Sequence, residues 1–131
     1  QIEKVYNLKG AKGAISIAYA PEEKLLFVVS QGTDNLQILD ATDGKLKADV
    51  KVGAGPLAVV WEPVRKLAYV ANRGSDSVAV VDVNGNLVAN LPGGSYANHV
   101  FTDGKGTVWS VNKARGLNDP QGDHISRYAA K

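Results

Sequence analysis

Short apolar runs alternate with turn residues along the whole chain. In the middle of the sequence, β-branched and other apolar residues are concentrated in four runs, at 57–61, 67–71, 77–82 and 87–91. Runs of this length, bounded by Gly, Pro, Asp and Asn, are typical of β-strands, and no window has the 3.6-residue period of a helix. Asx-Gly pairs, which suit tight hairpins, lie at 43–44, 84–85 and 103–104. We therefore predict an all-β protein built from antiparallel hairpins.

The runs recur with a period of about 42 residues. Residues 19–30 are similar to 61–72, and residues 101–112 form a third, looser copy. The offset is 42 between Phe27 and Tyr69, and 40 between Tyr69 and Trp109. Four antiparallel strands in about 40 residues make one blade of a β-propeller. We expect three blades, at 10–52, 53–92 and 93–131, of which the last lacks its outer strand.

The two ends of the chain differ from complete blades. Residues 2–8 alternate like an outer strand, so 1–9 are predicted to complete a preceding blade, and the last apolar run, at 125–128, is the third strand of its blade. Propellers typically carry about four to eight blades, because each blade is buried only by its neighbours. The closure argument favours part of a longer propeller. Two alternatives are a half-ring, in which residues 2–8 complete the last blade of a second copy, and a self-closed ring of three blades.

The tetrad at 69–72, Tyr-Val-Ala-Asn, resembles the Tyr-Val-Thr-Asn signature of bacterial YVTN-repeat propellers, with looser copies at 27–30 and 109–112. Residues 63–70 and 77–82 resemble the carboxy-terminal third of YncE-like proteins. The resemblance implies a seven-bladed ring in the bacterial periplasm, an export signal in a preceding part, no recognised catalytic centre, and binding of single-stranded DNA. The third copy departs from the pattern, because Trp109 replaces the tetrad's Tyr.

Composition narrows the classes of function. The 131 residues include 15 Lys and Arg against 13 Asp and Glu, a net charge of +2, so the basic excess of a dedicated polyanion-binding protein is missing. The absence of Cys excludes thiol catalysis, disulfides and cysteine-ligated metals. The longest apolar run, 54–61, falls far short of the roughly 20 residues that span a bilayer, so we expect no membrane span.

Candidate binding residues gather on one predicted face. In a propeller, the loops between blades and the loops between second and third strands share this face. The third copy has its longest loop there, at 113–124, where the earlier copies use about five residues. Such insertions are often functional, although a plain surface insertion explains this one equally well. The candidate ligand- or nucleic-acid-binding residues on this face and the adjoining inner strand are Lys12, Arg73, Tyr96, Asn98, His99, Lys113 and Arg115.

In a single-stranded DNA site, the basic residues would contact phosphates and Tyr96 would stack on a base. The pattern is weak, because Asp34 and Asp76 interrupt any basic stripe. The other aromatic residues are expected to pack between blades. These core candidates are Phe27, Trp61, Tyr69, Phe101 and Trp109.

Catalytic and metal-dependent chemistry remain as alternatives. His99 aligns with the apolar Val59 and Ile17 on the inner strands, where it is either a base or ligand beside the channel or a structural histidine. A metal site could be drawn from three residues of the long loop, Asp119, Asp123 and His124, although these residues suit a surface turn as well.

No nucleophile-elbow or phosphate-loop motif is present. We therefore predict a non-enzymatic binding module without a cofactor or metal. The alternatives are a propeller that uses His99 or His124, or a scaffold that docks other components of the cell envelope.

Overall fold

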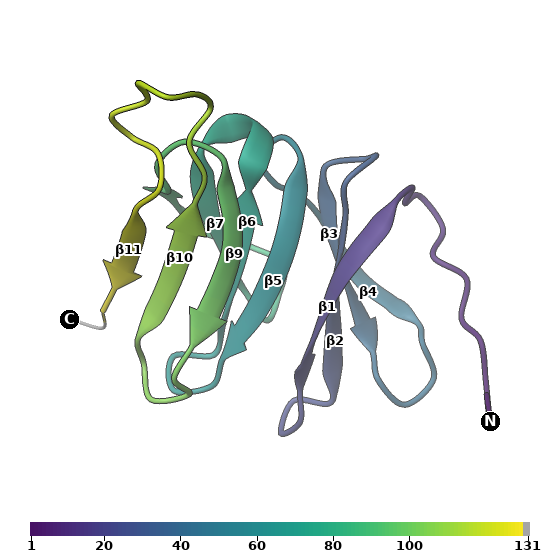
Figure 1. The fold of residues 1–131 in the computed structure, drawn as a ribbon. Coiled ribbons are helices and arrows are strands. Elements are labelled where there is room, and N and C mark those ends of the chain that lie inside the picture. The colour runs from purple at the N-terminus through teal and green to yellow at the C-terminus, as the bar shows by residue number, and fades with distance from the viewer. Residues whose placement is uncertain (130–131) are drawn as a thin grey trace.

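A computed structural model describes residues 1–129, which form three antiparallel β-sheets (Figure 1). Sheet A contains β1 (Ala14–Ala20), β2 (Leu25–Ser30), β3 (Asn35–Asp40) and β4 (Leu46–Lys51). Sheet B contains β5 (Pro56–Glu62), β6 (Leu67–Asn72), β7 (Ser77–Asp82) and β8 (Leu87–Pro92). Sheet C contains β9 (Ala97–Thr102), β10 (Val108–Asn112) and β11 (Ile125–Tyr128). The 3₁₀ helix η1 (Arg73–Ser75) precedes β7.

Each sheet is a meander in which consecutive strands pair. The strands of sheet B begin and end within one residue of the predicted ones, and the predicted last strand at 125–128 is β11. The Asx-Gly turns are confirmed as well, since Gly44, Gly85 and Gly104 have φ of 75°, 85° and 72°. Local turn chemistry therefore sets where each strand stops. The all-β class is confirmed, in the form of blade-like sheets of three or four strands.

The sheets stack face to face, with one apolar layer between A and B and another between B and C. In the first layer, Phe27 of sheet A stacks on Trp61 of sheet B with 5.1 Å between ring centroids. In the second, Tyr69 of sheet B is 2% exposed and packs with Val100 and Val108 of sheet C. Side chains alternate between the two faces of a strand, so sheet B contributes to both layers. The predicted core positions of Phe27, Trp61 and Tyr69 are confirmed.

The outer faces of sheets A and C carry apolar side chains that the described residues leave exposed. Phe101 is 65% exposed, so its prediction as a core residue is wrong for this chain. It pairs with Trp109, and directly paired residues share a face of a sheet. That face points away from sheet B, whereas Val100 and Val108 point toward it.

Residues 1–8 form no strand in this structure. They lie beside sheet A, where the Tyr6 hydroxyl donates to the Thr42 carbonyl oxygen over 3.4 Å. A strand requires hydrogen bonds to a neighbouring strand, so the predicted pairing of this segment with another blade stays a prediction. Within residues 1–129, no helix is long and apolar enough to cross a membrane.

Candidate functional site

The loops that enter the three sheets meet the loops between second and third strands at one end of the molecule, and the same hydrogen bond recurs there. The amide of Arg73 donates to Gly55 over 3.0 Å, and the amide of Lys113 donates to Tyr96 over 3.3 Å. The corresponding bond in sheet A joins Gln31 to Gly13 over 2.9 Å. Gly13, Gly55 and Tyr96 are therefore equivalent positions in the three sheets.

Tyr96 has a backbone conformation that the other two sheets assign to glycine. The φ angles at Gly13, Gly55 and Tyr96 are 69°, 59° and 49°. The left-handed region costs a residue with a Cβ roughly 1–2 kcal/mol, and bulky side chains are uncommon there. Strained positions that persist in a fold are often functional, so Tyr96 is the first candidate of this site.

In sheets A and B, an aspartate at the start of the third strand ties its sheet to the loop that enters the next sheet. Asp34 Oδ1 accepts the Gly55 amide over 2.9 Å, and Asp76 Oδ1 accepts the Tyr96 amide over 2.9 Å. Both aspartates have a left-handed backbone, with φ of 52° and 53°. Asp123, with φ of 54°, is the third member, and its Oδ1 accepts the Ala114 amide of its own loop over 3.1 Å. We call Asp34, Asp76 and Asp123 the linker aspartates.

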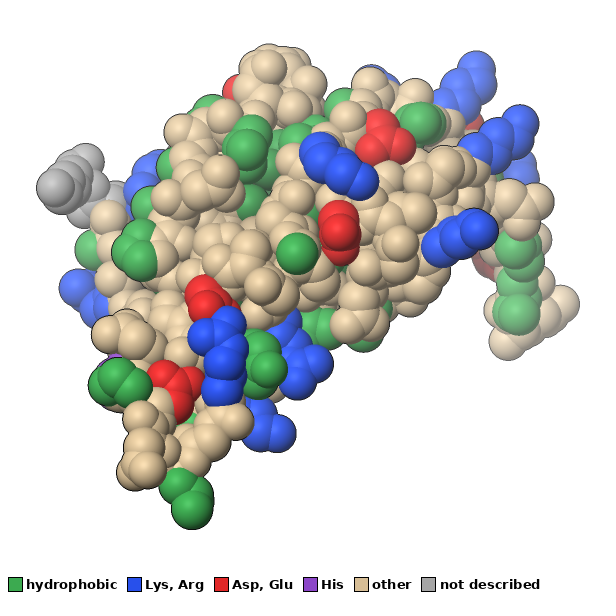
Figure 2. Space-filling model, turned by 90° about the horizontal axis from the view of Figure 1, so that it is seen from above, with side chains coloured by type: hydrophobic (Ala, Val, Ile, Leu, Met, Phe, Trp, Pro, Cys, Tyr) green, Lys and Arg blue, Asp and Glu red, His purple; other side chains and the backbone are tan. Residues whose placement is uncertain are grey.

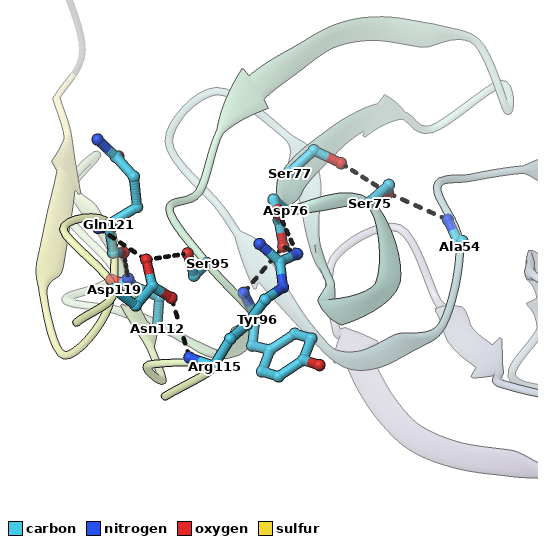
Figure 3. A network of polar contacts seen from close by, with 10 residues as sticks. All are labelled: Ala54, Ser75, Asp76, Ser77, Ser95, Tyr96, Asn112, Arg115, Asp119 and Gln121. Carbon is cyan, nitrogen blue, oxygen red and sulfur yellow. Dashed lines mark hydrogen bonds and ion pairs between the residues drawn. The ribbon is translucent and has the colours of Figure 1, made fainter. Parts of the chain in front are cut away.

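Two guanidinium groups converge on the Tyr96 ring. The Cζ atoms of Arg73 and Arg115 lie 4.5 and 4.6 Å from the ring centroid, within the range of cation–π contacts. Arg115 also donates through Nη2 to both carboxylate oxygens of Asp76 (Figure 3). We call Arg73, Asp76, Tyr96 and Arg115 the Tyr96 cluster. It joins sheet B, the loop that enters sheet C, and the long loop of sheet C.

The ion pair alters the acidity of both partners. The hydrogen bond from Arg115 is the main cause that lowers the pKa of Asp76, and the Tyr96 amide acts in the same direction. The same bond raises the pKa of Arg115. The two side chains are 34% and 44% exposed, so water and salt screen their attraction. The cluster therefore holds charged groups that a solute can reach.

Asp119 organises the 113–124 loop. Its carboxylate accepts the Arg115 amide, the Ser95 hydroxyl and the Gln121 amide, each over 2.9 Å (Figure 3). These bonds, first among them the one from the Arg115 amide, lower the pKa of Asp119. Gln121 in turn accepts the Ser95 amide over 3.0 Å through its carbonyl oxygen. The loop is thus held by its own turn bonds in the position that brings Arg115 to Asp76.

One residue near the start of the 113–124 loop differs from the repeat. This difference explains where the loop departs from the shorter loops of sheets A and B. The amide of Gly74 donates to the Ala54 carbonyl oxygen over 2.8 Å, and a Cβ on Gly74 would lie only 2.9 Å from that oxygen. The equivalent residue in sheet C is Ala114, whose Cβ is incompatible with so close an approach. Its amide instead donates to Asp123. The loss of this glycine in the third copy is a signal for a rearranged loop that is visible in the sequence but is not among the predictions above.

The structure brings together only part of the predicted site. Arg73, Tyr96 and Arg115 form one cluster, and Lys113 is bonded to Tyr96 through its amide with its side chain exposed. Lys12 lies in the loop that enters sheet A, where its amide donates to Thr33. Acidic and basic side chains lie side by side on this end of the molecule (Figure 2). Asp76, which is predicted from the sequence only to interrupt the positive charge, is a member of the cluster.

Asn98 and His99 belong to β9 and lie outside the Tyr96 cluster. His99 pairs with Val111 on the outer face of sheet C, where it lines a shallow hollow with Phe101 and Trp109. Val59 points toward sheet A instead, so the predicted equivalence of His99 with Val59 and Ile17 is wrong. Equivalent residues of β5 and β9 are 41 positions apart in the sequence rather than 40. A shift of one residue moves a side chain to the opposite face of the strand.

Among residues 1–129, no three His, Cys, Asp or Glu side chains are grouped to hold a metal ion. The candidate metal ligands Asp119, Asp123 and His124 therefore do not form such a group. The two carboxylates accept backbone amides instead.

Comparisons with known proteins identify the fold alone. No family model matches the sequence, and no curated protein matches it. Among solved structures, the chain is similar to the Kuenenia stuttgartiensis hydrazine synthase, with a TM-score of 0.78 and 22% sequence identity. The match covers 98% of this chain and 36% of that chain, so this chain spans about a third of that neighbour's length.

Proposed function

We propose that this chain is part of a YVTN-repeat β-propeller of the bacterial periplasm and acts as a non-catalytic binding module for an anionic polymer, single-stranded DNA. The stacked blade-like sheets and the tetrad at 69–72 support the family. One observation carries the function: two guanidinium groups and an aromatic ring converge at the end of the molecule that bears the loops.

Sites for single-stranded nucleic acid combine cations for the phosphates with flat groups on which bases stack. Arg73 and Lys113 are exposed and offer the first phosphate contacts. Arg115 lies against Tyr96, and a guanidinium on an aromatic ring presents a further flat surface for a base. Asp76 offsets part of the positive charge, so we expect modest affinity with a marked dependence on salt.

The test is the binding of a fluorescent oligothymidylate to the chain, followed by anisotropy at several salt concentrations. Arg73→Ala should weaken binding and reduce the slope of log affinity against log salt by about 0.7, the contribution of one single-strand phosphate contact. Arg115→Ala should weaken binding as well, because it removes a stacking surface.

Lys105→Ala is the matched control, since it removes one exposed positive charge in the β9–β10 turn, at the opposite end of the sheets. Equal affinity in the wild type and both arginine variants would rule out this surface. No detectable binding at low salt would reject the proposed function.

A further inference from the structure

The two guanidinium groups of the Tyr96 cluster differ in how much of their charge a ligand can use. Arg115 donates through Nη2 to both carboxylate oxygens of Asp76 (Figure 3). The Arg73 guanidinium lies on the Tyr96 ring, and none of the ion pairs among residues 1–129 includes it. A phosphate can therefore approach Arg73 as an unpaired cation, whereas at Arg115 it meets a cation that a carboxylate has already neutralised.

The junction between sheets B and C fixes Asp76 independently of Arg115. Asp76 has a left-handed backbone, its Oδ1 atom accepts the Tyr96 amide over 2.9 Å, and its carbonyl oxygen accepts the Gly93 amide over 3.0 Å. Asp34 makes the equivalent two bonds over the same distances in the first junction, where no described basic side chain forms an ion pair with it. The carboxylate thus belongs to the repeated framework, and Arg115 is brought to it.

Arg115 is held so that it offers a flat surface. Its Cζ atom lies 4.6 Å from the centroid of the Tyr96 ring, and its side chain is still 44% exposed. Its amide donates to Asp119 Oδ2 over 2.9 Å, so the second carboxylate near Arg115 holds the backbone and leaves the guanidinium to Asp76. A guanidinium is planar and weakly hydrated, and it stacks on flat groups even when its charge is paired.

Bases and phosphates respond differently to such an arginine. A base carries no net charge, so it can stack on Arg115 without being repelled by the Asp76 carboxylate. A phosphate brought to Arg115 lies beside the same carboxylate, and like charges repel. Selectivity between two ligands often depends on a repulsive element of this kind as well as on attraction.

We propose that Asp76 is a specificity-determining residue, which makes this site selective for a nucleic acid over an anionic polymer that lacks bases. The inference rests on the proposed binding of single-stranded DNA. Arg73 contacts phosphate, and Arg115 stacks on a base because Asp76 withholds its charge. A polymer that has phosphates but no bases can use only the first of these contacts.

The experiment compares two fluorescent probes of equal length and charge, an oligothymidylate and an abasic oligodeoxyribonucleotide, by anisotropy at several salt concentrations. The wild type should bind the oligothymidylate at least about fivefold more tightly, the lower end of what one stacked base contributes.

Asp76→Asn should reduce this preference. The variant keeps an oxygen for the Tyr96 amide and frees the charge of Arg115 for a phosphate. Affinity for the abasic polymer should rise more than affinity for the oligothymidylate, since on the latter a phosphate contact competes with stacking. The slope of log affinity against log salt should steepen by about 0.7 for the abasic polymer, the contribution of one phosphate contact. Asp34→Asn removes the same charge from the first junction and should leave the preference unchanged.

Arg115→Ala separates the role of the arginine from a general change of charge. In the wild-type background it should remove most of the preference for oligothymidylate without changing the salt slope, because Arg115 contacts no phosphate there. In the Asp76→Asn background it should abolish the gain in slope. Urea unfolding curves of all variants establish that each is folded under the conditions of the binding assay.

The outcomes distinguish this inference from the proposed function. A wild type that binds both polymers equally would overturn the role of Asp76 and leave the binding of single-stranded DNA in place. So would a preference that Asp76→Asn leaves intact, or one that Asp34→Asn reduces to the same extent. If neither probe binds to the wild type or to Asp76→Asn, the proposed function fails, and the role of Asp76 fails with it.

Discussion

The junction between sheets A and B and the junction between sheets B and C are built on the same backbone plan but differ at their loop ends. In both, a linker aspartate in a left-handed conformation accepts an amide of the next loop. In the first junction the donor is Gly55, and Gly74 closes the loop against Ala54. In the second, Tyr96 and Ala114 replace these glycines, and the 113–124 loop projects from the sheet.

The comparison shows how a repeat can acquire a site without losing its framework. The hydrogen bonds that hold successive sheets together involve backbone amides and the linker aspartates, so they survive the replacement of glycine. The changes are local. Tyr96 adopts a strained left-handed backbone conformation. Ala114 cannot approach the carbonyl oxygen of the entering loop as closely as Gly74 does in sheet B. The freed loop then brings Arg115 to Asp76 and Tyr96.

The largest expected effect comes from making the first junction resemble the second. Gly74→Ala would place a Cβ 2.9 Å from the Ala54 carbonyl oxygen and break the bond between them. We expect a loss of about 1–2 kcal/mol in the free energy of unfolding, measured with urea. Gly116→Ala, whose added Cβ would meet nothing within 4 Å, is the control and should change stability by less than about 0.5 kcal/mol. Equal stability of the two variants would refute the steric explanation of the long loop.

A smaller effect should follow from removing the charge of the linker aspartate in the second junction. Asp76→Asn keeps an oxygen for the Tyr96 amide but loses the ion pair with Arg115, so the variant should be less stable at neutral pH. The pKa of Asp76 is lowered in the folded state, mainly by the hydrogen bond from Arg115. The stability that the ionised Asp76 carboxylate contributes is therefore present above the unfolded-state pKa of about 3.9. It is lost as pH falls through the lower pKa of the folded state.

The difference in unfolding free energy between wild type and Asp76→Asn should accordingly shrink below about pH 4. Urea unfolding at neutral and acidic pH measures it. Asp34→Asn is the matched control in the first junction, because Asp34 forms no ion pair among residues 1–129. A difference between wild type and Asp76→Asn that grows in acid would contradict the assignment.

The smallest change in stability is expected when the second junction is made to resemble the first at Tyr96. Tyr96→Gly relieves left-handed strain of about 1 kcal/mol but removes the ring that Arg73 and Arg115 contact, so the two effects oppose each other. The expected signature is faster trypsin cleavage after Arg115, because the loop loses that contact. Tyr96→Phe keeps the ring and should be cleaved like the wild type. Equal cleavage of both variants would show that the ring does not hold the loop.

Most of the fold could be predicted from the sequence, whereas the site could be predicted only in part. Strand positions and hairpins follow from alternation and Asx-Gly turns, which are local. Arg73, Tyr96 and Arg115 are predictable as site residues because the repeat places their loops at one end. The bond between Arg115 and Asp76 could not be foreseen, since it joins residues 39 positions apart through an irregular loop.

By itself, the sequence determined the all-β class, the period near 42 residues and the order of strands, because these depend on side-chain alternation and turn residues within each unit. Only the tertiary structure decided which face of β9 carries His99 and Phe101, because one residue of register moves every side chain of a strand to the other face. It also decided that Asp76 belongs with Arg115. Such pairings depend on how separate sheets stack, and no short stretch of sequence encodes that stacking.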